Sequence, residues 1–460
     1  MSVPPANPPP SPDAARTTTT RNGSRLMYTP HRARHRAAIV LAAAVTLVAT
    51  GCTAEKKDGN AGSPGSQAAP PAPKVAPGVT ADSIKIGITY PDMASIRQFV
   101  NIDYGDFELA YNTLIKKIND AGGINGRKIV PVYGKINLIS PAAAQETCVK
   151  LTQDEKVFAV LGSFNGDEPL CYVQTNKTAA VGGQLTAKRY AQAQAPWFAF
   201  YRGGDELSEG MSLLAANNSL AGKKVAVVSN INEQAVMKDT VIPALQKLGV
   251  TPVETGVLDA PPQDPAAVGQ QTGVFIQKFQ AAGADTVVVV GSMGASFPQV
   301  LEQTKYRPRL LFTDVGQANG YTGDKAKHDF STLNDAAALG FRGGWDASGN
   351  QDCVAALEAA APDLKGKLVD AATLPPGAPN PGASASQACQ NLALFKAIAD
   401  KAGKDLSYET FQNAGFTLGS LPIPTYSDPA VYARETPHGN IPVRLWKYDP
   451  ATQKFAVSTG

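Results

Sequence analysis

Residue types that perform covalent or metal chemistry are scarce in the sequence after residue 80. This part has two histidines, His328 and His438, which are far apart and lie in polar, loop-like sequence, so we expect both to be solvated. It has no Gly-x-Ser-x-Gly string and no glycine loop of the phosphate-binding kind. Two distant histidines leave little for Ser-His-Asp, Cys-His or His-metal catalysis. The sequence therefore favours a binding protein over an enzyme, and we expect no cofactor and no metal.

The cysteines indicate disulfide chemistry. Four of the five follow residue 100, at Cys148, Cys171, Cys353 and Cys389, and an even number is typical of an oxidising compartment. Four cysteines allow three connectivities, and the sequence does not choose among them. Pairing in sequence order is the simplest, and it closes loops of about 24 and about 37 residues.

Hydrophobic runs predict the elements that position the polar residues. Runs rich in Val and Ile, apolar on both faces, predict buried parallel strands. They occupy residues 84–90, 128–134, 157–162, 224–230, 286–292 and 309–314. Between them apolar residues recur with the helical period, as from Phe107 to Ile118, and Gly122 and Gly123 end that helix. Repeated strand–helix–strand units predict an α/β fold, and on the order of ten strands exceed one ordinary sheet, so we expect two lobes.

Polar and aromatic residues that follow these strands are candidate ligand contacts. In open parallel sheets, ligands bind beyond the carboxyl ends of the strands, where helix N-termini offer free backbone N–H groups. In the first half of the sequence the candidates are Tyr90, Met93, Ser163, Phe164, Asn165, Gln184, Leu185 and Tyr201. In the second half they are Asn230, Asn232, Glu233, Ser292, Met293 and Asp314. Each residue could instead serve a loop or a helix cap.

The first 80 residues predict export and anchoring. A basic patch from Arg32 to Arg36 precedes an apolar run at residues 37–51, which is shorter than the about 20 residues of a membrane span. We expect residues 1–51 to be a secretory signal with an N-terminal extension, and Met27 is an alternative start. The string LVATGC resembles a bacterial lipobox, which implies that Cys52 is lipidated. Residues 52–80 then form the lipidated cysteine and a flexible tether, because they are poor in large apolar side chains.

The distribution of charge argues against nucleic acid as a partner. The formal net charge is +3, but six of the 42 basic residues and only one of the 39 acidic residues lie within residues 1–51. The remainder is therefore close to neutral. It lacks the basic surface that attracts phosphate backbones.

One stretch carries a family resemblance. The string INDAGGINGRK at residues 118–128, within the segment 104–129, is similar to the leucine/isoleucine/valine-binding family of type I periplasmic binding proteins. The order of the elements is similar from residue 82 to about residue 450. The resemblance implies two doubly wound parallel-sheet lobes joined by three crossover strands. It places lobe 1 at 82–203 plus 347–424, and lobe 2 at 204–346 plus 425–456.

The resemblance also implies a site, from which this sequence departs. The family's amino-acid binders hold the ligand carboxylate with Ser and Thr residues after the third strand, and the ammonium with an acid after a later strand. Here only Ser163 remains of that hydroxyl run, since Phe164 and Asn165 follow it, and Asp314 lies one residue from the position of the acid. These departures favour another small solute, polar or partly stacked on an aromatic ring.

We therefore expect a lipid-anchored, extracytoplasmic monomer that captures a small polar, amino-acid-like or related solute between two lobes. It would deliver this solute to an ABC permease without catalysis. A ligand-sensing receptor module of the same fold is one alternative. An extracellular hydrolase is another, and the scarcity of histidine counts against it.

Overall fold

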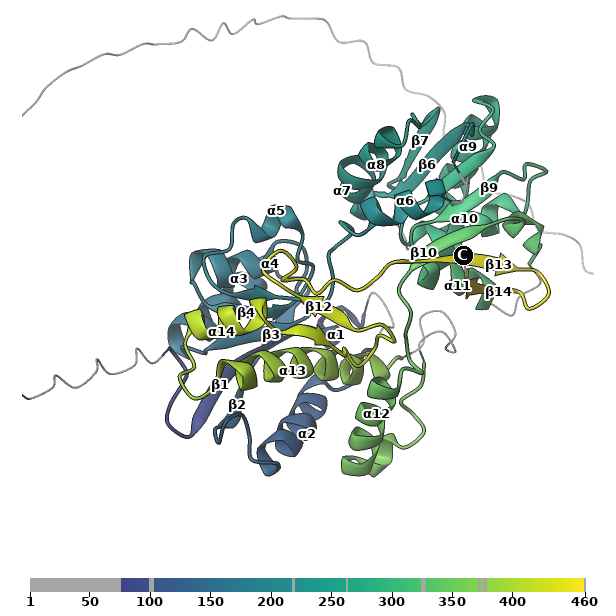
Figure 1. Ribbon diagram of the computed structural model, residues 1–460. Coiled ribbons are helices and arrows are strands. Elements are labelled where there is room, and N and C mark those ends of the chain that lie inside the picture. Colours follow the sequence, from purple (N-terminus) through teal and green to yellow (C-terminus); the bar gives the residue numbers. More distant parts are fainter. Residues whose placement is uncertain are drawn as a thin grey trace, which may run out of the picture. The chain divides into compact units, whose positions relative to one another are not determined.

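The computed structural model describes residues 76–98, 103–216, 220–261, 264–323, 328–370, 374 and 379–458 (Figure 1). The predicted signal at residues 1–51, Cys52 and the tether as far as residue 75 lie outside the described residues. Within the described part, no helix is long and apolar enough to cross a membrane.

The first sheet is wholly parallel, with the strand order β2-β1-β3-β4-β5. Its strands are β1 (Ser83–Asp92), β2 (Lys128–Asn137), β3 (Ala159–Gly162), β4 (Ala179–Gly182) and β5 (Trp197–Phe198). The helices between these strands are α1 (Met93–Ile96), α2 (Phe107–Asp120), α3 (Ala143–Val149) with η1 (Lys150–Asp154), α4 (Glu168–Leu170) with η2 (Cys171–Thr175), and α5 (Ala187–Tyr190). The prediction of a parallel α/β unit in this half is confirmed.

Later segments of the chain also pack on the first sheet. They are α12 (Ser348–Ala360), η6 (Pro362–Leu364), α13 (Gly382–Ala402), α14 (Tyr408–Phe416), and the antiparallel pair β11 (Gly419–Leu421) and β12 (Ala430–Tyr432). Figure 1 shows α13 running beside α2 and the strands of this sheet. The Asn391 side chain on α13 donates a hydrogen bond to the Tyr111 hydroxyl on α2 at 2.8 Å, which ties the two segments together across 280 residues of sequence.

The second sheet has the order β14-β13-β10-β9-β8-β6-β7. Five strands are parallel: β6 (Val225–Asn230), β7 (Glu254–Leu258), β8 (Thr286–Val289), β9 (Arg309–Phe312) and β10 (Ala337–Gly340). β13 (Arg444–Asp449) and β14 (Lys454–Val457) add an antiparallel edge. Its helices are α6 (Leu207–Ala216), η3 (Ile231–Glu233), α7 (Gln234–Val236), η4 (Met237–Val241), α8 (Ile242–Lys247), α9 (Pro265–Ala281), α10 (Met293–Leu301), α11 (Val315–Gly323) and η5 (Phe330–Leu333).

Both sheets are covered on both faces, as a doubly wound fold requires. Successive side chains of a strand point to opposite faces. In β3, Ala159 and Leu161 belong to one buried cluster and Val160 to another. In β6, Val228 and Val227 divide between two further clusters in the same way. The Val- and Ile-rich runs are therefore apolar throughout because each face meets a layer of helices.

β2 corrects one expectation. Residues 128–134 were expected to form a strand buried on both faces, but β2 is the edge strand of the first sheet and Val130 on it is 42% exposed. An edge strand has a neighbour on one side only, so its side chains are less covered. Lys128 and Lys135 on this strand are exposed too.

Three segments join the two groups of elements: 199–206 after β5, 341–347 after β10, and 433–443 between β12 and β13. The third lies later than the predicted boundary between residues 424 and 425. Ala430, Tyr432 and Ile441 belong to the buried cluster of the first sheet, and the Tyr432 hydroxyl donates to the Ala199 carbonyl at 3.0 Å. The other lobe boundaries stay a prediction.

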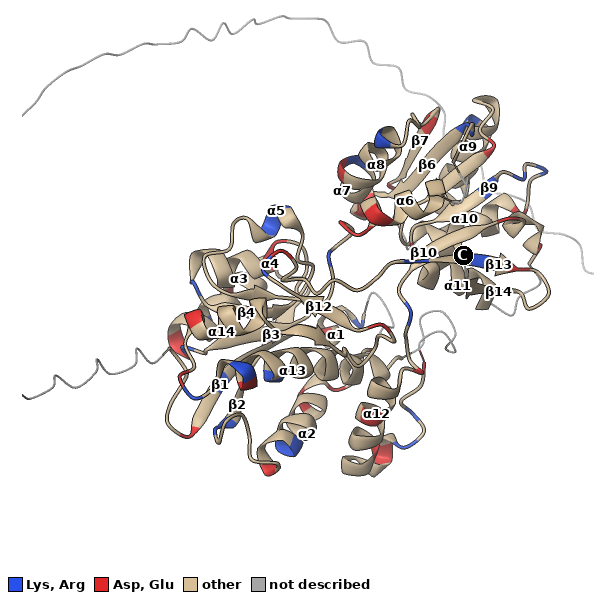
Figure 2. Ribbon diagram, viewed as in Figure 1, with Lys and Arg blue, Asp and Glu red and all other residues tan. Residues whose placement is uncertain are grey.

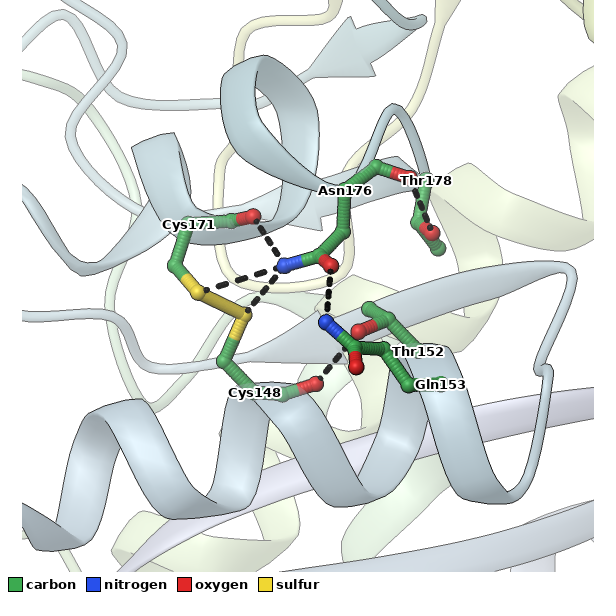
Figure 3. The surroundings of a disulfide bond; sticks show 6 residues. All are labelled: Cys148, Thr152, Gln153, Cys171, Asn176 and Thr178. Atoms are coloured by element: carbon green, nitrogen blue, oxygen red, sulfur yellow. Dashed lines mark hydrogen bonds between the residues drawn. A yellow bond between two sulfur atoms is a disulfide. The ribbon is translucent and has the colours of Figure 1, made fainter.

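Two disulfides link the helices around the first sheet in the simplest of the connectivities left open by the sequence. Cys148 pairs with Cys171, which joins α3 to η2, and Cys353 pairs with Cys389, which joins α12 to α13. Figure 3 shows the first bridge with the Asn176 side chain beside it. The Asn176 amide donates to the Cys171 carbonyl at 2.9 Å and approaches the Cys148 sulfur at 3.3 Å.

Candidate functional site

A cavity of about 560 Å³ lies at the carboxyl ends of the strands of the second sheet. Its walls come from the residues that follow β6, β8, β9 and β10, together with the first two joining segments and residues 425–426. The charged and large side chains among them are Tyr201, Glu206, Glu233, Asp314, Phe341, Arg342, Tyr426 and Trp446. The volume falls within the range of small-molecule sites, and the position is the one at which open α/β sheets bind ligands.

Five of the predicted contact residues share this cavity. They are Gln184 after β4, Tyr201 on the first joining segment, Asn232 and Glu233 after β6, and Asp314 after β9. They come from four places in the sequence. The rule that ligands bind beyond strand ends therefore selected residues that the fold brings together.

Glu233 is held by a polar network between the ends of β6 and β8. Its carboxylate accepts hydrogen bonds from the Ser292 backbone N–H at 2.9 Å and the Ser292 hydroxyl at 3.0 Å. The Asn230 side chain accepts from the Glu233 N–H at 3.1 Å and donates to the Ser292 hydroxyl. The carboxylate lies against Gly291, whose φ of +56° and lack of a Cβ make room for it. Asn230 and Ser292 thus lie outside the cavity wall but orient a residue on it.

Two other predicted residues, Tyr90 and Met93, line a second cavity of about 580 Å³ beside β1 and α2. The Tyr90 hydroxyl donates a hydrogen bond to the Glu108 carboxylate. Burial and this carboxylate raise the pKa of Tyr90 above its ordinary value. The first cavity does not include either residue.

The remaining predicted residues line neither cavity. Phe164, Leu185 and Met293 are at most 4% exposed and pack in hydrophobic clusters. Ser163 and Asn165 are exposed after β3. The sequence could not separate inward from outward side chains in a tight turn. Their roles as ligand contacts stay a prediction.

Glu206 is a cavity residue that the sequence analysis missed. It is only 6% exposed, and its carboxylate accepts a hydrogen bond from the Gly204 N–H at 2.9 Å. Burial raises the pKa of Glu206, and the hydrogen bonds that it accepts from backbone N–H groups oppose this shift. Burial likewise raises the pKa of Glu233, with a further contribution from the charge of Asp314.

Tyr201 lies among these acids. Burial raises the pKa of its hydroxyl, and the neighbouring charges of Glu206 and Asp314 raise it further. The Tyr201 hydroxyl therefore stays protonated at any physiological pH and can donate a hydrogen bond to a solute.

Phe341, Arg342, Tyr426 and Trp446 were also missed. Phe341 and Arg342 lie on the second joining segment, Tyr426 lies between β11 and β12, and Trp446 lies on β13; no strand-end rule selects these positions. A usable signal was present, because the string Arg-Gly-Gly occurs twice, at residues 202–204 and 342–344, once in each of the first two joining segments. Arg342 is paired with Asp428 at 3.5 Å, and Asp428 also accepts from Arg444 at 3.2 Å.

Neither histidine is solvated as expected. The side chain of His328 is only 8% exposed and lies beside Glu302 at 3.1 Å, and its ring centre is 4.7 Å from that of Tyr321. His438 is half-buried, and burial lowers its pKa. For His328 the prediction was wrong because polar neighbours in sequence do not keep a loop residue exposed when aromatic residues, here Tyr321 and Phe330, pack against it. Neither histidine lines the first cavity.

The architecture of two doubly wound sheets joined by three segments is the type I periplasmic-binding-protein fold. Residues 83–307 match the model of the family described as periplasmic binding protein. The resemblance in the sequence is thereby confirmed. No curated protein sequence matches the chain.

Solved structures agree on the fold. A periplasmic binding protein type 1 from Bordetella pertussis Tohama I has a TM-score of 0.57 and 15% identity, over 82% of this chain and 100% of that one. An ABC transporter substrate-binding protein from Desulfitobacterium hafniense in complex with Leu has a TM-score of 0.55 and 14% identity over the same shares. A solute-binding protein of an ABC transporter from Rhodopseudomonas palustris BisB5, in complex with 3,4-dihydroxybenzoic acid, has a TM-score of 0.54 and 16% identity over 81% and 95%. The family and these relatives are binding proteins, not enzymes.

Proposed function

We propose that this protein is the solute-binding component of an ABC-type importer and holds one small organic solute in the first cavity. The observation that supports this most is the lining of that cavity. It consists of strand-end residues of the second sheet and of residues on the segments that join the two groups of elements. The ligands named for the two relatives, Leu and 3,4-dihydroxybenzoic acid, support a small organic molecule as the solute class.

Capture would involve closure around the joining segments. Gly204 and Gly344 have φ values of +103° and +124°, backbone conformations that side-chain-bearing residues rarely adopt. A Cβ atom added at Gly344 would meet nothing within 4 Å, so the surrounding residues leave room for the backbone to move there. Because cavity residues flank both glycines, a change of backbone angle there would move the walls of the site.

We further propose that the mature protein is a monomer anchored by lipid at Cys52 on the outer side of the membrane, where it meets the permease. The lipobox-like string and the two disulfides support an extracytoplasmic location. The tether would let the binding body reach its partner while it remains attached.

The proposal is tested by finding the solute and measuring compaction. Native mass spectrometry of the protein after incubation with a cell extract should show one bound small molecule, and small-angle scattering should show a smaller radius of gyration with it. Tyr201→Ala should lose the molecule, whereas Tyr104→Ala, at an exposed tyrosine outside the cavity, should keep it. A molecule that both variants retain would place the site elsewhere.

A further inference from the structure

The charges of the first cavity indicate what kind of solute it accepts. Three carboxylates line it, on Glu206, Glu233 and Asp314, against the single basic side chain of Arg342. Arg342 is already paired with Asp428. In the described part of the chain none of the three cavity carboxylates forms an ion pair. Beside Glu206, Arg202 pairs with Glu209 and Asp205 adds a negative charge. Arg444 shares Asp428 with Arg342.

The three carboxylates are arranged around the cavity and not at one point. Among the described residues no group of three or more acids, histidines or cysteines is close enough to hold a metal ion. Burial raises the pKa of Glu233, and the negative charge of Asp314 raises it further, so the like charges act on one another. A positive group large enough to approach several of them would relieve this repulsion.

The same cavity offers aromatic surfaces to such a group. Tyr201, Phe341, Tyr426 and Trp446 line it, and aromatic faces attract cations, tryptophan most strongly. The Trp446 indole N–H is buried and has no hydrogen-bond partner within the described residues.

The loop after β3 lies outside the lining of the first cavity, and it also lacks a free group that could hold a solute carboxylate. The Asn165 backbone N–H already donates to the Glu168 carboxylate at 2.8 Å, so a negative charge occupies this turn. Asp167 in the same turn is paired with Arg189, which leaves that cation engaged. Phe164 contributes no polar group, because its ring packs against Tyr172 in the core. A solute carboxylate at this loop would meet repulsion from Glu168 without a free cation to offset it.

We propose that the solute is a small organic cation, an amine or quaternary ammonium with an apolar or aromatic body and no carboxylate. This proposal rests on the proposed function, since it assigns the chemistry of the same cavity. It distinguishes the protein from binders of zwitterionic amino acids.

The test uses compounds that share a skeleton and differ in charge. One series is 2-phenylethylamine, phenylalanine, 3-phenylpropionate and 2-phenylethanol; the other is 3-methylbutylamine, leucine and 4-methylpentanoate, with choline as a quaternary probe. Calorimetric titration of the mature protein should show that at least one amine binds at least about tenfold more tightly than the amino acid in the same series. The carboxylic acids should not bind. Equal or tighter binding of a zwitterion or an acid, or no binding of any amine, would overturn the cationic assignment.

Variants identify the groups responsible. Glu233→Gln and Asp314→Asn keep the shape of the side chain and remove its charge, so each should weaken the amine about tenfold or more while leaving 2-phenylethanol unchanged. Glu146→Gln, at an exposed acid on α3 outside the cavity, is the matched control and should change neither. Unchanged amine affinity in both cavity variants would also overturn the assignment. If native mass spectrometry finds a retained anionic solute, the assignment of a cationic solute is refuted and the proposed function stands. If it finds no bound solute of any kind, the proposed function itself is refuted.

Discussion

Removal of the Cys148–Cys171 bridge should destabilise the first group of elements strongly. The two cysteines are 23 positions apart, and the bridge closes the loop that contains β3. In the chain-entropy model, a loop of this length restricts the unfolded chain enough to stabilise the fold by about 3.5 kcal/mol. Replacing both residues in the variant Cys148→Ala/Cys171→Ala avoids a free thiol. The contacts of the Asn176 amide with the two sulfurs are lost as well.

Urea unfolding followed by circular dichroism measures this loss. We expect the midpoint of the double variant to fall clearly below that of the wild type under oxidising conditions. The variant Cys353→Ala/Cys389→Ala is the matched comparison, since its bridge spans 36 positions and should contribute slightly more, about 4 kcal/mol. In reductant, the unfolding midpoint of the wild type should equal that of a variant in which all four bridging cysteines are replaced by Ala. Equal midpoints for the oxidised wild type and both double variants would refute the entropy argument.

Three further predictions concern processing, redox state and pH. Cys52→Ala should abolish lipidation and release the protein from the membrane; unchanged retention in a labelled-lipid pulse experiment would contradict the proposed anchor. The denatured, mature protein should show no free thiols before reduction and four afterwards, and four reactive thiols without reductant would remove both bridges. Burial raises the folded-state pKa of Glu206, so the stability contributed by its protonated form is present below the unfolded pKa and lost as pH rises through the folded pKa. Glu206→Gln should therefore be more stable than the wild type at neutral pH and similar to it in acid, whereas Glu146→Gln should track the wild type throughout. Parallel thermal-unfolding curves of the wild type and Glu206→Gln across pH would count against this account.

The parallel-strand architecture could be read from the sequence because burial on both faces leaves a direct mark on composition. The runs in β3, β6, β8 and β9 are almost wholly apolar, since helices cover each side of the sheet. β2 reads much the same in sequence yet lies at an edge. Position within a sheet depends on pairing between distant strands, which local composition does not encode.

The candidate site was partly accessible for a related reason. Glu233 and Asp314 follow their strands directly, so the strand-end rule found them. Glu206, Arg342 and Trp446 reach the cavity from joining segments and an antiparallel strand, whose approach is decided by tertiary packing. Figure 2 shows acidic and basic residues interspersed over both groups of elements, so the excess of acids in the cavity is local and invisible in the overall charge.

The central claim is that a solute binds in the cavity formed by strand ends and joining segments. The most direct test is calorimetric titration of the solute found by native mass spectrometry into wild type and Asp314→Ala. Loss of this side chain should leave a polar group of the solute unpaired, which costs on the order of 1 to 3 kcal/mol, or roughly tenfold or more in Kd. The free energy of unfolding should fall by only about 1 kcal/mol, because Asp314 is exposed and the variant loses one capping hydrogen bond, which its carboxylate accepts from the Gly316 N–H at the start of α11. Full affinity in Asp314→Ala would contradict the account.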